Sequence, residues 1–274
     1  MQVREKVVAL TGAGSGIGRA LAVLLAQAGA RLALADRDEV GLDETARLVA
    51  FSGGQHNASE HVADVSDEAA VQRFAAQVVE RYGTVDIAIN NAGVALFGTV
   101  AELSSDEMAW LMGVNFWGVV YGTKAFLPTL VTRPEAAIVN LSSVFGLWGP
   151  PGQSAYAASK FAVRGFSESL RAELSGTSVR VVTVHPGGVK TAIAARSRVA
   201  RAADPARAAR MSAIFEREFL TTPAQTAAAA ILVGLQRGEE RILIGADARR
   251  IDRLTRLFPV RGPRWLLARA GRVQ

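Results

Sequence analysis

A serine, a tyrosine and a lysine in the middle of the chain have the types and spacing for proton transfer at an alcohol. Tyr156 follows Ser143 by thirteen residues, and Lys160 follows the tyrosine by four. Residues four apart lie on one face of an α-helix, so the phenol and the ammonium are expected to be neighbours. A free tyrosine has a pKa near 10, and lowering it to about 7 takes roughly 4 kcal/mol, which an ammonium and a positive nicotinamide ring can jointly supply in a low-dielectric cleft. With Ser143 donating to the substrate oxygen, the pattern predicts a Tyr156 acid/base that works while hydride moves to or from a cofactor.

Each of these residues taken alone also has a structural interpretation. Tyr156 can be a packing aromatic, Lys160 a solvated helix residue and Ser143 a turn or cap residue. Their joint spacing favours catalysis. A Ser–His–Asp hydrolase is disfavoured because the sequence has no G-x-S-x-G elbow, and we interpret His185, the only histidine near the expected cleft, as structural.

Strand-length apolar runs alternate with longer amphipathic stretches along the chain. Such runs are typical of strands that helices cover on both faces. Half of the 274 residues are hydrophobic, which is enough for one large core. We therefore predict an α/β fold with a single domain: a Rossmann-like doubly wound seven-stranded parallel sheet with helices on both faces. The expected strands are residues 7–11, 31–36, 61–65, 85–90, 136–142, 179–185 and 241–245.

The stretch "TGAGSGIG", residues 11–18, lies between the first expected strand and the first helix. Backbone amides at such a turn attract a pyrophosphate, and glycines allow its close approach. The glycines do not fit the G-x-G-x-x-G frame, because its third position is Ile17. Their placement still indicates a nucleotide site rather than a plain tight turn. The residues expected to contact the cofactor here are Gly12, Gly14, Ser15, Gly16, Ile17 and Gly18.

Asp36, at the end of the second expected strand, is placed to accept hydrogen bonds from an adenosine ribose. Its charge repels a 2′-phosphate and favours NAD over NADP. Arg37 beside it can pair with a phosphate, so NADP stays open. A helix cap is the structural alternative for Asp36. Asp64 and Val65 are expected to bracket the adenine, and Asn91, Ala92 and Gly93 form a polar turn after the fourth strand.

The composition excludes several classes of protein. The chain has no cysteine, so it has no disulfide or thiolate metal site, and we expect no metal. The N-terminus lacks the features of a signal peptide, and no stretch of eighteen apolar residues occurs. We expect a cytoplasmic protein.

The C-terminal residues carry the whole excess of positive charge. Residues 247–274 contain eight arginines and two acidic residues, whereas residues 1–246 contain 23 basic and 23 acidic residues. We predict a dehydrogenase domain over 1–246 and a basic amphipathic extension over 247–274. Ile251, Leu254, Leu257 and Phe258 are expected on one helical face. Docking against a neighbouring subunit is favoured over peripheral contact with an anionic membrane, and nucleic acid is not an expected partner.

The sequence resembles the short-chain dehydrogenase/reductase family over nearly residues 4–246. The resemblance is carried by "TGAGSGIG", "NNAG", "VNFWG", "YAASK", "HPGGVKT" and the Ser143–Tyr156 interval. It implies Tyr156 as acid/base, Lys160 binding the nicotinamide ribose and lowering the pKa of the tyrosine, and Asn115 holding a water in a proton relay. It also implies that a segment near the nicotinamide amide and phosphate includes Pro186, Gly187, Val189 and Thr191. Members of the family are commonly homo-tetramers or homo-dimers.

The segments expected to line the substrate pocket are apolar: residues 94–97, residues 144–152 and Ile193. They predict a hydrophobic secondary alcohol or its ketone as substrate. Phe145, Leu147 and Trp148 can equally well be packing residues. Residues 190–220 are expected to form a substrate lid, with Met211, Ile214 and Phe215 on a lid helix. The alternative function is a catalytically silent nucleotide-binding protein whose basic tail binds a membrane or a partner.

Overall fold

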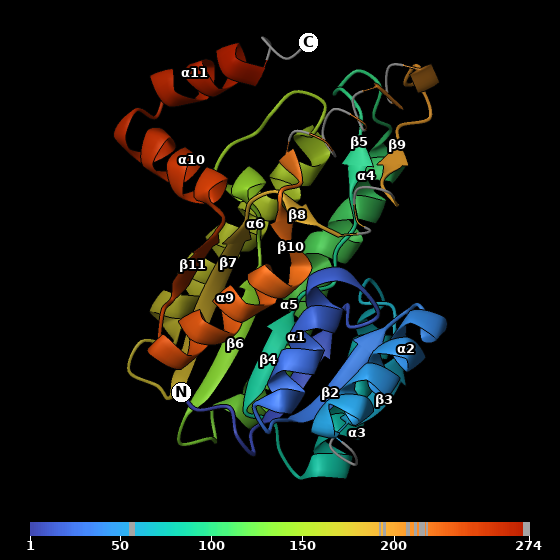
Figure 1. Cartoon of the computed structure of the whole chain (residues 1–274), viewed down its shortest axis with the longest axis vertical. Helices are drawn as coiled ribbons and strands as arrows, with labels where there is room; N and C mark the ends of the chain where they lie inside the picture. The colour runs from blue at the N-terminus through green and yellow to red at the C-terminus, as the bar shows by residue number, and fades with distance from the viewer. Residues whose placement is uncertain are drawn as a thin grey trace.

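The centre of the protein is a single parallel sheet. The computed structural model describes residues 1–54, 58–191, 193, 196–206, 209–210, 213, 217 and 219–270. Within them seven strands pair in the order β11-β7-β6-β4-β1-β2-β3, all parallel (Figure 1). The strands are β1 Val7–Thr11, β2 Arg31–Asp36, β3 Ala58–Val62, β4 Ile87–Asn90, β6 Ala136–Leu141, β7 Val179–Pro186 and β11 Arg241–Ile244. The predicted doubly wound sheet is confirmed.

The third strand begins and ends earlier in the chain than predicted. Six predicted strands agree with the observed ones to within two residues, but β3 spans Ala58–Val62 rather than 61–65. β3 is the edge strand beyond β2, and only Ser59 in it is buried. An edge strand of this kind has no continuous apolar run to mark it. Asp64 therefore lies past the strand, in a turn where its carboxylate accepts hydrogen bonds from Ser66.

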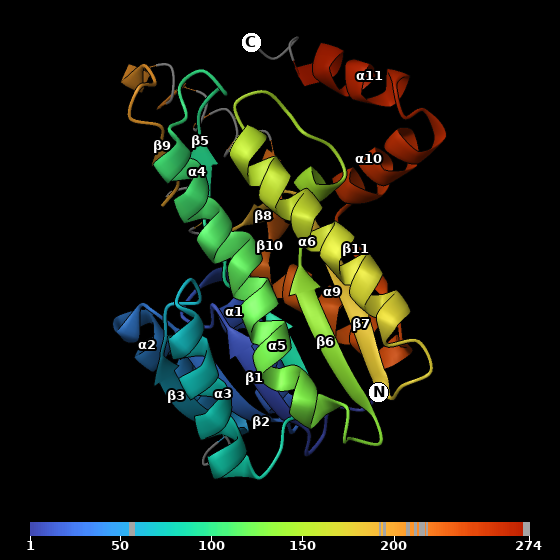
Figure 2. The same cartoon turned by 180° about the vertical axis from the view of Figure 1, so that it is seen from behind.

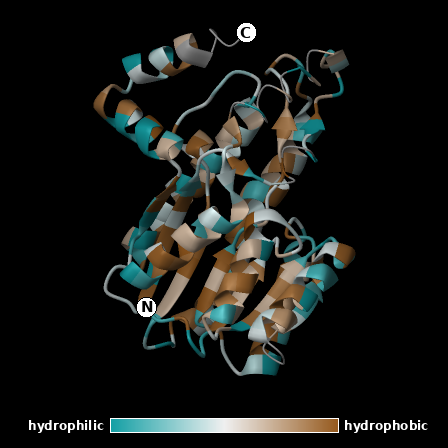
Figure 3. Cartoon of the chain, in the orientation of Figure 1, coloured by the Kyte–Doolittle hydropathy of each residue, from teal (hydrophilic) through white to brown (hydrophobic). Residues whose placement is uncertain are grey.

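Helices cover both faces of the sheet (Figures 1 and 2). One face packs against α1 and α9, through side chains such as Leu21, Leu25 and Ile231. The other packs against α3, α5 and α6, where Phe74 and Phe126 meet edge to face. Figure 3 shows the strands as the most hydrophobic part of the chain. The helices of the body are α1 Gly16–Gln27, α2 Glu39–Val49, α3 Glu68–Tyr82, α4 Ser105–Met112, α5 Gly118–Leu130, α6 Ser154–Glu173 and α9 Ala224–Arg237, with short helical segments η1 Ala50–Gly54, η2 Gly113–Trp117 and η3 Val144–Gly146.

Two small strand pairs lie beyond the carboxyl ends of the main strands (Figure 1). β5 Leu96–Phe97 pairs with β9 Arg198–Val199, and β8 Val189–Lys190 pairs with β10 Thr222–Pro223. The first pair brings the expected lid segment alongside an expected pocket segment. Met211, Ile214 and Phe215 lie outside the described residues.

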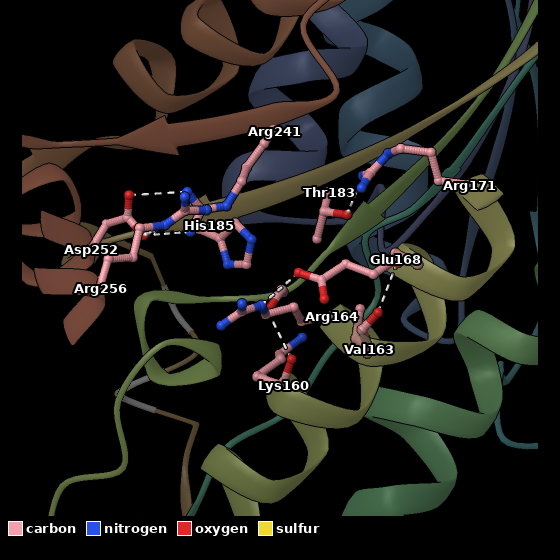
Figure 4. A network of polar contacts seen from close by, with 12 residues as sticks. Lys160, Val163, Arg164, Glu168, Arg171, Thr183, His185, Arg241, Asp252 and Arg256 are labelled. Carbon is pink, nitrogen blue, oxygen red and sulfur yellow. Dashed lines mark hydrogen bonds and ion pairs between the residues drawn. The ribbon is translucent and has the colours of Figure 1, made fainter. Parts of the chain in front are cut away.

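The C-terminal extension forms a helical hairpin of α10 Ala246–Leu257 and α11 Arg261–Ala270 at the same end of the molecule (Figures 1 and 2). Asp252 of α10 joins it to the sheet by pairing with Arg241 of β11, and it also pairs with Arg256 one turn along α10 (Figure 4). Ala248 is fully buried, and Ile251 packs in the same apolar cluster. The hairpin is thus held against the sheet by both charge pairing and apolar packing.

None of the helices in the described residues is long and apolar enough to cross a lipid bilayer.

Candidate active site

The glycine loop at the start of α1 has the form of an anion site. Gly12 has φ +67°, and a Cβ on it would lie 2.7 Å from the Cα of Ala92, so only glycine fits this turn. The Ser15 side chain makes no capping hydrogen bond, and the first turn of α1 holds no acidic residue. The amides at this helix end can therefore receive a phosphate.

Asn91 fixes the loop in place. Its Nδ2 donates to the carbonyl oxygens of Thr11 at 2.9 Å and Gly12 at 3.0 Å, and its backbone N donates to Thr11 Oγ1. The turn after β4 is thus joined to the turn after β1. The expected cofactor residues Ala92 and Gly93 follow directly in the chain, so they lie beside the glycine loop.

The Asp36 carboxylate is held at the end of β2. Its Oδ2 accepts from the backbone N of Gly14 at 2.8 Å, and its Oδ1 accepts from Asp38 N at 3.0 Å. The negative charge is therefore fixed beside the glycine loop. Arg37 is exposed and makes no ion pair within the described part of the chain.

Arg19 supports the same loop and was missed by sequence reasoning. Its guanidinium donates to the carbonyl oxygen of Gly14 and to Thr45 Oγ1, and it pairs with Glu44 at 2.8 Å. The available signal was its position directly after Gly18, in the first turn of α1. Arg19 links the loop to α2, so the loop is braced from both sides.

Val65 lies near this loop, whereas the carboxylate of Asp64 is turned to Ser66. Val65 is buried in a small cluster that includes Val114 and Ala92, and Ala92 in turn touches the loop. Asp64 Oδ1 accepts from the hydroxyl of Ser66 at 2.7 Å. Of this expected pair, Val65 is the one whose side chain packs toward the glycine loop.

Ser143, Tyr156 and Lys160 come together at the carboxyl end of β6. Ser143 caps η3 by accepting from the backbone N of Phe145 at 3.1 Å, and it also hydrogen-bonds the Tyr156 phenol. Tyr156 and Lys160 lie one turn apart on α6, with Nζ 5.7 Å from the centre of the tyrosine ring. The Nζ donates to the carbonyl oxygen of Leu141 at 2.9 Å. The predicted helical spacing therefore produces the predicted neighbours.

Burial pushes both titratable groups of this cluster toward their neutral forms. It raises the pKa of Tyr156, and the hydrogen bond from Ser143 opposes that rise only in part. It lowers the pKa of Lys160 to about 8. Burial therefore has a larger effect on the pKa of the phenol than the Ser143 hydrogen bond does.

Asn115 connects three parts of the site. It lies in the π-helical segment η2 and is fully buried. Its Oδ1 accepts from Val94 N at 2.8 Å, while its Nδ2 donates to Val94 O and to Ser159 Oγ. Single π turns often occur at functional sites. This one ties the segment after Gly93 to the helix that carries Tyr156.

The segment from Pro186 to Thr191 runs from the end of β7 toward the glycine loop. A Cβ on Gly16 would lie 3.1 Å from the Thr191 methyl carbon, so the two segments nearly touch. The backbone N of Gly188 donates to Asp247 Oδ2 at 2.7 Å. Asp247 is a second residue that sequence reasoning missed, because it was grouped with the tail. An acid in the first turn of a helix, two residues after Gly245, was the available signal.

His185 is buried between this segment and the catalytic cluster. Its Nδ1 lies 3.1 Å from the carbonyl oxygen of Ser143 and must donate to it. Its Nε2 has no hydrogen-bond partner within the described residues. Burial lowers its pKa to about 4, so the ring is neutral at pH 7. Figure 4 shows it beside the Arg241–Asp252 pair, and these contacts support a structural role.

No group of three or more histidine, aspartate or glutamate side chains that could hold a metal ion occurs in the part of the chain that the structure describes.

Comparison with known proteins agrees with this geometry. A sequence model of the short chain dehydrogenase family matches residues 6–202. The chain belongs to this family. It is therefore an oxidoreductase of the short-chain dehydrogenase type. The segment 6–202 includes the glycine loop, Asn115 and the Ser143–Tyr156–Lys160 cluster.

Relatives cover nearly the whole short-chain dehydrogenase chain. A "putative oxidoreductase SadH" of Mycobacterium tuberculosis is 44% identical over 255 residues, covering 92% of this chain and 91% of the relative. A short-chain dehydrogenase/reductase from Burkholderia phymatum, solved in complex with NAD, has a TM-score of 0.84 and 32% identity, covering 94% of this chain and 96% of that one. An alcohol dehydrogenase from Thermococcus sibiricus, complexed with 5-hydroxy-NADP, has a TM-score of 0.73 and 29% identity over 85% of this chain and 91% of that one.

Proposed function

We propose that the protein interconverts a hydrophobic secondary alcohol and its ketone with NAD as the preferred cofactor. The observation that carries the proposal is the Ser143–Tyr156–Lys160 cluster, which lies at the same end of the sheet as the glycine loop, with Ser143 and Lys160 buried and Tyr156 half-buried. A bound NAD supplies a hydride acceptor, and NADH a donor. The cofactor residues are those of the glycine loop with Asp36, Arg37, Val65, Asp64, the 91–93 turn and the 186–191 segment.

In this proposal Tyr156 moves the proton at the substrate oxygen. Its hydroxyl accepts the alcohol proton in oxidation and donates it in reduction. Ser143 donates to the same oxygen and steadies the charge that develops there. Lys160 presents a cation beside the phenol, and the Leu141 carbonyl fixes its position. Asn115, whose side chain joins the Val94 backbone to Ser159 of α6, would hold a water in a proton relay to solvent.

The fixed carboxylate of Asp36 supports NAD over NADP. A 2′-phosphate would have to approach a negative charge that two backbone amides hold in place. The Burkholderia protein of the comparison was solved with NAD, and the Thermococcus enzyme with an NADP derivative. The exposed Arg37 keeps weaker use of NADP open.

The surroundings of Tyr156 support an apolar substrate. Phe145 meets the Tyr156 ring edge to face at 6.1 Å, and Phe145 and Trp148 are both nearly buried. These side chains pack together, as the structural interpretation expected, and they also bring an apolar wall to the phenol. Residues 190–220 are proposed as the lid, since β9 lies along β5.

An exposed aromatic face supports a homo-oligomer. Trp117 is 46% exposed and stacks on Tyr121, and Phe161 on α6 is 42% exposed. Large apolar side chains at this exposure favour contact with a second copy of the chain.

The test is Tyr156→Phe combined with a screen of hydrophobic alcohols and ketones, followed by nicotinamide absorbance with NAD and NADP. We expect turnover to fall by about 10²–10⁴-fold, with unchanged NADH affinity by fluorescence titration. Tyr121→Phe removes a phenol outside the site and should keep full turnover. A Tyr156→Phe protein with wild-type turnover would overturn the acid/base role of Tyr156. Wild-type protein that binds NADH but turns over nothing in the screen would favour the catalytically silent alternative.

A further inference from the structure

The elbow between α10 and α11 exposes a cluster of large apolar side chains. Leu257 is 71% exposed, Val260 65%, Trp265 50% and Phe258 43%. Within this cluster, Phe258 and Trp265 contact each other with ring centres 5.2 Å apart. We call these four residues the apolar tip. Leu257 differs from the sequence expectation, because Ile251 and Leu254 are half-buried while Leu257 points to solvent.

The hairpin that carries the apolar tip is rich in arginines, and most of those that the structure describes have no acidic partner. Both acids of the extension are occupied: Asp247 by Gly188 N, and Asp252 by Arg241 and Arg256. This leaves five arginines of the hairpin without a carboxylate partner in the described part of the chain: Arg249, Arg250, Arg253, Arg261 and Arg264. Three of them, Arg249, Arg250 and Arg253, line a surface depression of about 430 Å³.

The apolar tip projects from the molecule on a rigid support. Figure 1 shows α10 leading up and away from the end of β11 and α11 turning back at its far end, and Figure 3 shows hydrophobic residues at the elbow between hydrophilic turns of α10 and α11. The support is firm because Ala248, Ile251 and Leu266 pack in one cluster with Phe145 and Trp148. Ordered apolar surface is thus held out to solvent rather than folded back.

We propose that this hairpin docks on an anionic lipid bilayer, with the apolar tip inserted at the level of the headgroups. A tryptophan and aliphatic side chains suit the boundary between headgroups and acyl chains, and arginines around them suit lipid phosphates. The docking surface lies beside the segment that carries Phe145 and Trp148, so the bound protein holds its catalytic cluster close to the lipid surface.

Charge favours a bilayer over a second copy of the chain as the occupant. A two-fold interface pairs each surface with itself, so a dimer through this hairpin would set unpaired arginines against the same arginines. Like charges held together in an interface cost several kcal/mol. An anionic bilayer instead complements every one of them, and its interior accepts the apolar tip.

The test is co-sedimentation of the full chain with vesicles of phosphatidylglycerol and phosphatidylcholine, compared with phosphatidylcholine alone. We expect binding only to the anionic vesicles. Arg250→Gln with Arg253→Gln should weaken the partition coefficient by roughly 25-fold, since each arginine near an anionic surface contributes about fivefold. The matched control is Arg47→Gln with Arg73→Gln, which removes two exposed charges on α2 and α3.

The apolar tip is tested separately. Leu257→Ser with Trp265→Ser should lose most of the binding. The control is Phe51→Ser, which should keep the binding: Phe51 is 92% exposed and lies just before β3, at the sheet edge opposite β11. Tryptophan emission should shift to shorter wavelength on anionic vesicles, and Trp265→Phe should abolish that shift while keeping the binding. Surface variants are preferable to truncation after Ala246, because truncation also removes Asp247 and Ala248 from their buried contacts.

Three outcomes would overturn the proposal. The first is equal partition of the wild type and the Arg250/Arg253 variant. The second is equal binding to neutral and anionic vesicles. The third is a wild-type oligomer, seen by sedimentation velocity, that the Leu257/Trp265 variant breaks into monomers, because a second copy of the chain would then cover the apolar tip.

Discussion

The two halves of the sheet treat their polar groups differently. In the half with the glycine loop, Asp36 accepts hydrogen bonds from backbone amides and Asn91 donates to backbone carbonyls. The protein's own contacts therefore hold the loop in place. In the half with α6 and β7, three titratable side chains have few partners: Lys160 and His185 are buried, and Tyr156 is half-buried. Burial disfavours the charged form of each. The first half is a rigid cradle, and the second is an electrostatically incomplete site.

The largest expected effect comes from removing the buried cation. Lys160→Met should lower kcat by about 10³-fold, because the phenol loses the cation beside it and burial already raises the pKa of Tyr156. The rise of kcat with pH should also move to a higher pH than in the wild type. Steady-state kinetics over a pH series measures both changes. Lys124→Met, at an exposed position on α5, is the control. A Lys160→Met enzyme with the wild-type pH profile would show that proton transfer by Tyr156 does not depend on the charge of Lys160.

The second effect concerns stability at acidic pH. The pKa of His185 is about 4 in the fold against an ordinary 6.5, so the unfolded chain binds a proton that the folded chain does not. Stability is therefore complete above pH 6.5 and falls as the pH drops from 6.5 toward 4, by about 3 kcal/mol in all. Urea unfolding across this range should show the loss, and His185→Asn, which keeps a donor for the Ser143 carbonyl, should flatten it.

His61 provides the matching test in the other half. Burial also lowers its pKa, but its ring nitrogens have partners in Ser59 and Gln77. His61→Asn should therefore change the pH dependence of unfolding less than His185→Asn does. Equal changes would remove the contrast between the halves.

The third effect is a change of cofactor preference. Asp36→Asn keeps an acceptor for Gly14 N but removes the charge, so the ratio of kcat/KM with NADP to kcat/KM with NAD should rise at least about tenfold. Adding Arg37→Gln should reverse part of the gain, because Arg37 is the residue placed to pair with the 2′-phosphate. An unchanged ratio in Asp36→Asn would mean that this carboxylate does not select the cofactor.

The smallest effect tests the link between the extension and the site. Asp247→Ala removes the acceptor for Gly188 N and should raise KM for NAD about fivefold, the size expected for losing one partly exposed hydrogen bond to a charged group. Asp247→Asn keeps an acceptor and should lie closer to the wild type. A KM for NAD that is unaffected in both variants would show that the contact of the extension with the 186–191 segment does not contribute to cofactor binding.

Local pattern was enough for much of the fold and the site. Six strands followed from buried apolar runs, and the glycine loop from its place between strand and helix. The Tyr156–Lys160 contact followed from the helical repeat alone. Edge strand β3 was placed wrongly because one exposed face leaves no apolar run to recognise.

The sequence by itself determined what depends on neighbours a few residues away: the strand–glycine loop–helix unit, the i,i+4 pair on α6 and the basic character of the extension. Only the tertiary structure decided what depends on distant partners. Asp247 reaches Gly188 across 59 positions of the chain, and the same fold turns Leu257 outward while burying Ala248. The direction of each pKa shift also belongs to the fold, because desolvation depends on which segments cover a side chain and not on the residues beside it in the sequence.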